Sequence, residues 1–149
     1  VKLNGAILTG SNLRDANLTK ANLSGVNLSG MDLTGAQLER VDLSDADLTG
    51  ADLTRANLWN AILTRADLSG ADLTGADLFR VNSTPGSLNG FVDLRWADMT
   101  GVNLSGADLR YADLTGADMT GANLTGANLD GAKFHNTIMP DGSIKSSAT

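Results

Sequence analysis

The stretch that decides the fold is ADLSGADLTGADLFRVNSTPGSLNG, residues 66–90. For fifteen residues it repeats one five-residue unit with leucine at its centre, at Leu68, Leu73 and Leu78. The unit is then lost, because Ser83 stands where the next leucine is due. The period and its interruption are the two features that a fold for this chain has to explain.

The same unit extends over most of the 149 residues. Leucine occupies all sixteen centres from Leu3 to Leu78, at intervals of five. Alanine stands two positions before most centres, and aspartate or asparagine stands one before. A second run of centres follows the interruption: Leu94, Met99, Leu104, Leu109, Leu114, Met119, Leu124, Leu129 and Phe134.

A period of five fits neither an α-helix nor a flat strand. Five residues turn an α-helix by about 500°, which would spread the leucines around its circumference. In a strand, side chains alternate with period two, so leucines five apart would face opposite sides. A turn once per unit resolves this conflict, because alanine and leucine then point inward and the residue between them points outward. The Thr/Ser-Gly pair makes the corner, where glycine tolerates unusual backbone angles.

These units resemble the motif A(D/N)LXX of the pentapeptide repeat family, and the resemblance extends from Val1 to Asn136. The chain is similar to small cyanobacterial members. The resemblance implies an all-β fold, a right-handed quadrilateral parallel β-helix with four units per coil. It implies about seven coils and a rod roughly 35 Å long at the usual strand spacing of about 4.8 Å. Leucine-rich repeats and calcium-binding nonapeptide repeats have different periods and motifs.

The interruption covers residues 81–91, and two interpretations of it remain open. In the first, Phe91 is one extra residue and the coil is a bulged one of about 21 residues. In the second, the segment is a protruding loop that docks a partner, since insertions in solenoids map to loops. Both keep one repeat domain over residues 1–136. Residues 137–149 are then a C-terminal cap and a disordered tail. Ile138 and Met139 of the cap, together with Phe134 of the last repeat unit, plug the last coil.

With twenty residues per coil, as the family implies, residues twenty apart stack on one face. After a one-residue shift for the interruption, this rule predicts an acidic ladder. Two interpretations of the ladder are open. It is either a solvated face whose charge repulsion is relieved by nearby Arg55 and Arg95, or a site for a cation or a positively charged partner. Its members follow Asn12 and are Asp32, Asp52, Asp72, Asp93 and Asp113.

The same rule predicts a basic and aromatic patch at the adjacent corner, which carries Lys20, Arg40, Asn60 and Arg80. Tryptophan and arginine are enriched at binding hot spots, so the patch is a candidate partner-binding surface. The alternative is that these are scattered exposed residues of the kind any monomer carries. The candidate residues are Trp59, Phe79, Arg80, Arg40 and Ile62. A second candidate comprises Trp96, Arg110 and Tyr111.

Composition argues against catalysis and against a cofactor. The single histidine, His135, lies where the repeat ends, and there is no cysteine. No motif for a metal or a phosphate is present, and a core of leucine and alanine leaves no room for a ligand. We therefore expect no enzyme, no catalytic residues, no metal and no cofactor.

The net charge of −6 disfavours direct binding of nucleic acid. No apolar run reaches the ~18–20 residues of a membrane span. The sequence starts at Val1 rather than methionine. A cytoplasmic location is favoured, and the periplasm or the thylakoid lumen is the alternative if an N-terminal signal was removed.

The function expected from these observations is that of a non-catalytic structural or protein-interaction module whose partner is another protein. The alternative is a DNA-mimicking protein that binds DNA gyrase or topoisomerase, as the family resemblance implies for some members. Six net charges over the rod give one per ~6 Å, whereas duplex DNA carries one per ~1.7 Å. The uncovered edges at the two ends of a stacked coil also predict end-to-end self-association.

Overall fold

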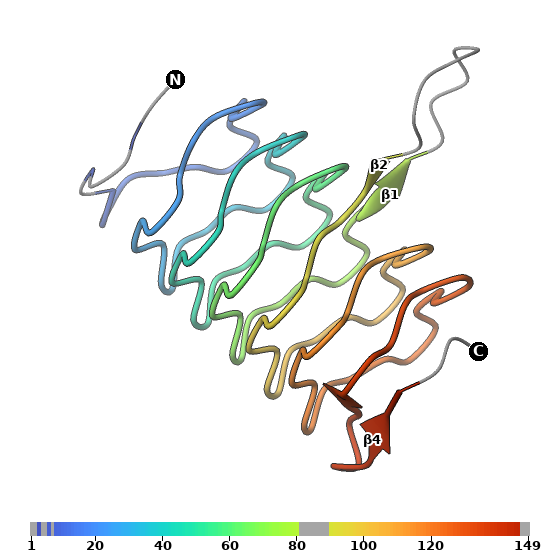
Figure 1. Cartoon of the computed structure of the whole chain (residues 1–149). Coiled ribbons are helices and arrows are strands. Elements are labelled where there is room, and N and C mark those ends of the chain that lie inside the picture. The colour runs from blue at the N-terminus through green and yellow to red at the C-terminus, as the bar shows by residue number, and fades with distance from the viewer. Residues whose placement is uncertain (1–2, 4–5, 7, 81–89, 147–149) are drawn as a thin grey trace.

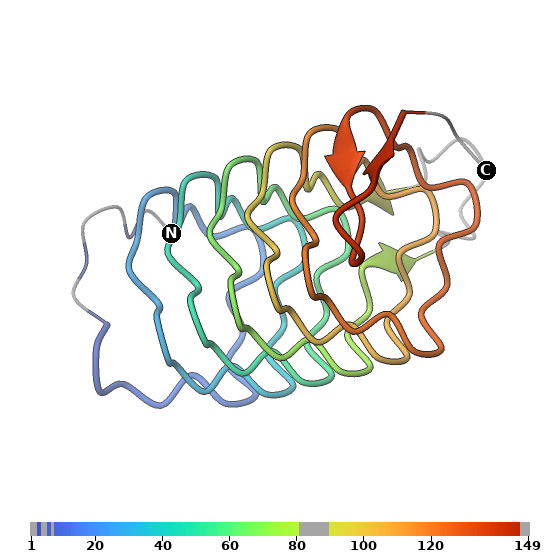
Figure 2. The same cartoon turned by 90° about the horizontal axis from the view of Figure 1, so that it is seen from below.

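A computed structural model describes the chain except residues 1–2, 4–5, 7, 81–89 and 147–149. The side chains of residues 79, 80, 90 and 91 also lie outside the described part. The backbone winds into stacked four-sided coils that form a rod, with the two ends of the chain at opposite ends of it (Figures 1 and 2). The right-handed quadrilateral β-helix predicted from the repeat is confirmed.

Regular strands are few, because each side of a coil is too short to form one. Four are present: β1 (Phe79–Arg80), β2 (Gly90–Phe91), β3 (Thr137–Ile138) and β4 (Ile144–Lys145). β1 pairs with β2, and β3 pairs with β4, both in antiparallel fashion. Elsewhere the coils are joined by single-residue parallel bridges. None of the residues that the structure describes lies in a helix.

The bridges define four faces, each a column of outward residues from successive coils. Face 1 contains Asp32, Asp52, Asp72, Asn103 and Asn123. Face 2 contains Asn17, Gln37, Asn57, Asp77, Asp108 and Asn128. Face 3 contains Asn22, Asp42, Ile62, Asp93, Asp113 and Lys133. Face 4 contains Asn27, Asp47, Asp67, Asp98, Asp118 and Ile138.

Each corner is a β-turn whose residues belong to the repeat unit. The N–H of Ala51 donates to the carbonyl of Leu48 (3.0 Å) across such a turn. Its third residue, Gly50, has φ 63°, a left-handed value that glycine adopts without cost. On the side that follows, the Asp52 carboxylate accepts the backbone N–H of Thr54 (2.9 Å) and fixes the start of the next turn. Sequence-local bonds therefore bend the chain once per unit.

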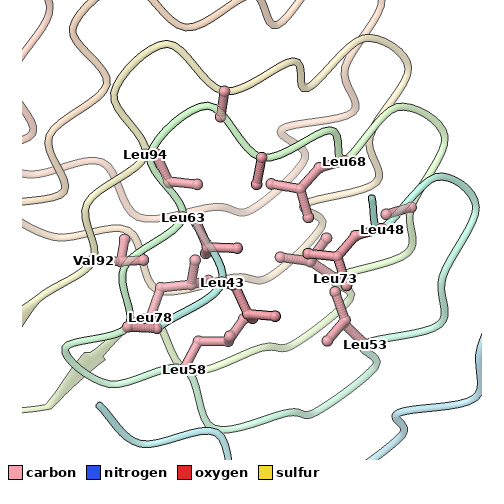
Figure 3. Close-up of a cluster of buried hydrophobic side chains, with 14 of the residues drawn as sticks. Leu43, Leu48, Leu53, Leu58, Leu63, Leu68, Leu73, Leu78, Val92 and Leu94 are labelled. Atoms are coloured by element: carbon pink, nitrogen blue, oxygen red, sulfur yellow. The ribbon is translucent and has the colours of Figure 1, made fainter. Parts of the chain in front are cut away.

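The turns bring every central leucine into one interior. Leu43 to Leu78 point toward the rod axis together with Val92 and Leu94 (Figure 3), and these leucines have no exposed surface. Full burial contributes roughly 1.5–3 kcal/mol for each leucine. Most residues at the other inward position are alanines, and they are also buried, so a small side chain fills the interior beside most corners.

Hydrogen bonds between coils satisfy the backbone of each side. The N–H of Leu48 donates forward to the carbonyl of Asp67 (2.7 Å). The N–H of Asp67 donates back to the carbonyl of Ala46 (2.9 Å). The equivalent bond one coil earlier runs from the N–H of Asp47 to the carbonyl of Val26 (3.0 Å). Because this pattern recurs on all four faces, each coil templates the next, and an uncovered coil presents unpaired groups.

The interruption differs from the bulged coil of about 21 residues, and that interpretation is wrong. Elsewhere, residues that bridge adjacent coils are twenty positions apart in the sequence. Across the interruption, Ile62 bridges Asp93 and Asp77 bridges Asp108, and the members of each pair are 31 positions apart. The chain thus inserts eleven residues (31 − 20), and β1 and β2 pair at the corner between faces 2 and 3, where the insertion begins and ends. Residues 81–89 of the loop predicted for residues 81–91 lie outside the described residues, so that interpretation stays a prediction.

The C-terminal cap is a hairpin rather than a simple apolar plug. β3 continues face 4, and β4 folds back along its far edge. A turn at Pro140–Gly142 joins the two strands, since Gly142 N–H donates to the Met139 carbonyl (2.8 Å). Phe134 is buried and Met139 is partly buried, whereas Ile138 stands in the outward column of face 4. The tail predicted to be disordered lies mostly outside the described residues.

Overfilling one inward alanine position tests the narrow interior. We expect Ala56→Phe to lower the free energy of unfolding by about 3 kcal/mol or more, because a ring must displace leucines of adjacent coils. Ala56→Ser buries a hydroxyl and should cost only about 1–2 kcal/mol. Chemical denaturation monitored by circular dichroism measures both. Ala127→Phe, at a half-buried position in the last coil, is the matched control and should cost less; equal losses at positions 56 and 127 would contradict the packing.

Candidate interaction surface

The five residues of the predicted acidic ladder do not form one column. Asp32, Asp52 and Asp72 stack on face 1, whereas Asp93 and Asp113 stack on face 3. The reason is the eleven-residue insertion, which advances the chain by two further sides relative to the one-residue shift assumed from the sequence. The bridge partner of Asp72 is therefore Asn103.

A different acidic column exists, and it is longer than either fragment. Asp47, Asp67, Asp98 and Asp118 follow one another on face 4. The corner beyond them carries glycine in each coil, at positions 30, 50, 70, 101 and 121. The 31-residue offset was the missing signal, because it places Asp98 beside Asp67. None of the ion pairs between described residues includes an aspartate of this column.

Local hydrogen bonds reduce the cost of this column of like charges. The Ser69 hydroxyl and backbone N–H both donate to the Asp67 carboxylate. These two bonds hold the pKa of Asp67 below its usual value, with the hydroxyl the larger cause. The charged form is thus stabilised within its own repeat unit, with no cation required.

The corner between faces 2 and 3 carries the predicted basic and aromatic residues in the expected order. Lys20 N–H donates to the Glu39 carbonyl, and Arg40 N–H donates to the Trp59 carbonyl (2.8 Å each), so Lys20, Arg40 and Asn60 occupy this corner in successive coils. Trp59 is half-buried, and its Nε1 is enclosed without a hydrogen-bond partner among the described residues. Phe79 and Arg80 form β1, but their side chains lie outside the described part.

The large hydrophobic side chains that are exposed lie mainly on and around face 3. Ile62, which the sequence assigned to the next side after Trp59, is in the face 3 column and 43% exposed. Tyr111, 48% exposed, lies at the corner between faces 2 and 3. Trp96, 57% exposed, lies at the corner between faces 3 and 4. These three residues, from three consecutive coils, are the exposed large hydrophobics of the described chain apart from Ile144 in the terminal hairpin.

The two aromatic corners are held in costly backbone conformations. Trp96 and Tyr111 both have φ 60°, a left-handed value that a bulky residue rarely adopts. Each ring lies over the glycine at the same corner of the next coil, Gly116 or Gly131, where a Cβ atom would collide with it. A small residue in one coil thus makes room for an aromatic ring from the coil before it.

Three arginines on or next to this surface are neutralised by neighbouring carboxylates. Arg95 pairs with Asp93 (2.7 Å) on face 3, and Arg65 pairs with Asp45 (2.7 Å) at the corner between faces 3 and 4. Both pairs use two guanidinium nitrogens, a geometry that orients the side chain. Arg110 pairs in the same way with Asp108 on face 2 (2.6 Å). The charge is therefore balanced locally, and the aromatic rings stand beside fixed ion pairs.

No group of three or more histidine, cysteine, aspartate or glutamate side chains in the described residues is placed to hold a metal ion. His135 lies in the last coil, one residue after the buried Phe134. The described part of the chain also contains no helix with the length and apolarity that a membrane span requires.

Comparisons with known proteins agree with this architecture. The family model for pentapeptide repeats matches in eight copies, which cover residues 1–35, 11–50, 21–60, 42–80, 91–126 and 103–139. The matches leave out residues 81–90, the segment of the insertion. Among curated proteins no match is found.

Three solved structures illustrate the similarity. HetL, a pentapeptide repeat protein involved in heterocyst differentiation regulation in the cyanobacterium Nostoc sp. strain PCC 7120, is 43% identical over 97% of this chain, with a TM-score of 0.78. This chain spans 64% of the HetL chain. Rfr23 from the cyanobacterium Cyanothece 51142 is 30% identical over 83% of this chain and 90% of its own, with a TM-score of 0.72. A pentapeptide repeat protein of the Arabidopsis thaliana thylakoid lumen is 35% identical over 80% of this chain and 72% of its own, with a TM-score of 0.50.

The contact between the Trp96 ring and Gly116 can be tested by substitution of the glycine. We expect Gly116→Ala to lower the free energy of unfolding by about 2–3 kcal/mol and to change tryptophan fluorescence, because the new methyl group displaces the ring. Gly50→Ala has the same left-handed backbone but no neighbour within 4 Å, so it should cost only about 1 kcal/mol. Denaturant titration compares the two variants. Equal losses, with unchanged fluorescence in both, would show that the ring does not rest on Gly116.

Proposed function

Because this chain belongs to the pentapeptide repeat family, we propose that it is a non-catalytic module that binds another protein through face 3 and its two corners. The observation that carries the proposal is the gathering of Ile62, Trp96 and Tyr111 on this side of the rod, in three consecutive coils. Aromatic residues are enriched at the energetic centres of protein interfaces. The rest of the described surface, outside the terminal hairpin, has no comparable group.

The position of the insertion supports the same side of the rod. β1 and β2 pair at the corner between faces 2 and 3, next to Tyr111 in the following coil and Trp59 in the preceding one. Insertions in repeat proteins map to one face of the solenoid, which is often the binding face. The corner patch predicted from the sequence, with Arg40 and Trp59, then forms the edge of this surface rather than its centre.

The rigidity of the rod favours binding over chemistry. The interior is filled by leucine and alanine side chains, most of them without exposed surface. A partner therefore meets a surface whose backbone is fixed by the ladder, and binding orders few residues, which lowers the entropic cost of association.

Substitutions on face 3 test the proposal. We expect Trp96→Ala combined with Tyr111→Ala to weaken binding of a partner captured by the native chain by at least about tenfold, with the melting temperature little changed. Trp59→Ala combined with Arg80→Ala tests the corner patch in the same assay. Arg55→Ala, at the corner between faces 1 and 2, is the control and should bind like the native chain. Undiminished binding by the Trp96/Tyr111 variant, measured by titration calorimetry, would disprove a role for face 3.

A second candidate function is the DNA mimic that binds DNA gyrase or topoisomerase. The observation that favours it is the aspartate column of face 4. This column adjoins the acidic part of face 1 at the corner that carries glycine in each coil. Two columns at about 4.8 Å spacing carry one charge per ~2.4 Å of rod, close to the ~1.7 Å of duplex DNA. This density is local, because face 1 continues with Asn103 and Asn123.

A supercoiling assay separates the two candidates. If the mimic hypothesis holds, the native chain should inhibit DNA gyrase or protect it from a quinolone, and the double variant Asp47→Asn with Asp67→Asn should lose most of this effect. The single variant Tyr111→Ala should keep it, since Tyr111 lies at the corner between faces 2 and 3, away from face 4. If the native chain neither inhibits gyrase nor protects it from the quinolone when it is in excess over the enzyme, the DNA-mimic hypothesis is excluded.

A further inference from the structure

The indole ring of Trp96 lies at the corner between faces 3 and 4, and one part of it is supported by the rod. The six-membered part of the ring rests against Gly116, the residue at the same corner of the next coil. Trp96 is nevertheless 57% exposed, so much of the ring meets solvent. The indole is therefore a supported aromatic platform whose outer surface is open to a partner.

Carboxylates stand on both sides of this platform. Asp113 precedes Gly116 by three residues and belongs to the face 3 column, whereas Asp118 follows it by two residues and belongs to the face 4 column. Chain geometry keeps their Cα atoms within about 11 Å and about 7 Å of the glycine. Asp98 follows Trp96 itself by two residues and is the bridge partner of Asp118. A group that lay on the ring would thus have carboxylates of two faces within reach of its edges.

These three carboxylates are held in place without a cation. Each accepts the backbone N–H of the residue two positions later, at 2.9–3.1 Å. None of the ion pairs between described residues includes Asp98, Asp113 or Asp118. Arg95 stands next to Trp96 in the chain, but its guanidinium binds Asp93 through two nitrogens (2.9 Å and 2.7 Å). The carboxylates around the ring therefore keep acceptor capacity for a further donor.

The other basic residues on this side of the rod do not cancel the negative charge. Arg65, at the same corner as Trp96, is paired with Asp45 (2.7 Å). Lys133 follows Asp113 in the face 3 column, but it takes part in none of the ion pairs between described residues. Three carboxylates outnumber its single charge. The surroundings of the ring thus favour a positively charged group.

A guanidinium group meets these conditions better than an ammonium group. It is planar and weakly hydrated, so it stacks on an indole ring at a low cost in solvation. Its five N–H donors have a fixed fork geometry, so its edges can donate to carboxylates while its face rests on the ring. An ammonium group is a compact and strongly hydrated point charge, which cannot make both kinds of contact equally well.

We propose that Trp96, with Asp98, Asp113 and Asp118 around it, is a docking site for an arginine side chain of the partner protein. This inference rests on the proposed function, because it names the chemistry by which a partner would recognise face 3 and its corner. Arginine is enriched at the energetic centres of interfaces, and such residues tend to pair with aromatic ones on the other side. The partner surface is accordingly basic where it meets this corner.

Short peptides test the site without the natural partner. A fluorescently labelled tetra-arginine peptide should bind the native chain, as measured by fluorescence anisotropy. A tetra-lysine peptide of the same charge should bind about tenfold more weakly, because it loses the stacking contact. A tetra-citrulline peptide, which has the shape of the arginine peptide without its charge, should not bind. Equal binding of the arginine and lysine peptides, or of the arginine and citrulline peptides, would overturn the proposal.

Variants locate the peptide on the rod. We expect Trp96→Ala, and separately Asp113→Asn with Asp118→Asn, to weaken binding of the tetra-arginine peptide about tenfold. Asparagine occupies the same position in other repeat units, so the double variant should keep its fold, which circular dichroism melting checks. Asp52→Asn with Asp72→Asn removes the same charge from face 1, opposite face 3, and is the matched control. If this control loses as much affinity, overall charge holds the peptide and the proposal is wrong.

The captured partner separates this inference from the proposed function. In the calorimetric titration, Asp113→Asn with Asp118→Asn should also weaken binding of the partner about tenfold. If Trp96→Ala with Tyr111→Ala abolishes this binding but the asparagine variant keeps the native affinity, the partner uses face 3 without an arginine at this corner. In that case only the present inference fails. If both variants bind like the native chain, the proposed function fails as well.

Discussion

The structure depends on one backbone constraint, a left-handed residue two positions after each central leucine. This residue closes a turn in which the next alanine N–H returns to the leucine carbonyl, as Ala51 does to Leu48. Because the turn recurs every five residues, the central leucines of the described units enter one interior, and the aspartates and asparagines that precede them stay outside. The ladder, the core and the four faces are consequences of this bend.

The same constraint explains why the exposed aromatic residues cost conformational free energy. At most corners glycine occupies the left-handed position without strain, but Trp96 and Tyr111 hold it with φ 60°. Each ring also requires a glycine in the next coil, so two positions are committed to each aromatic. Residues kept in unfavourable conformations are often those with a functional task. Face 3 thus has an aromatic residue in this conformation at each of its two corners.

The C-terminal end and the insertion show how the repeat is interrupted without loss of the ladder. The eleven extra residues leave at one corner and return to it, so Ile62 bridges Asp93 as closely as neighbouring coils bridge elsewhere. At the C-terminal end, the second strand of the hairpin takes the place of a further coil on face 4. In both places an antiparallel pair, β1–β2 or β3–β4, is used where the parallel ladder stops.

The sequence by itself determined the coil, because a five-residue period leaves only one interior for leucines such as Leu48 and Leu68. It also determined that Arg40 and Trp59 share a corner, since no interruption lies between them. Only the tertiary structure decided which residues stack across the insertion. Nothing local distinguishes one extra residue from eleven, because strand pairing restarts at Val92 in either case. The face 4 column and the gathering of Ile62, Trp96 and Tyr111 depend on that offset, and for this physical reason they could be found only once the coils were stacked.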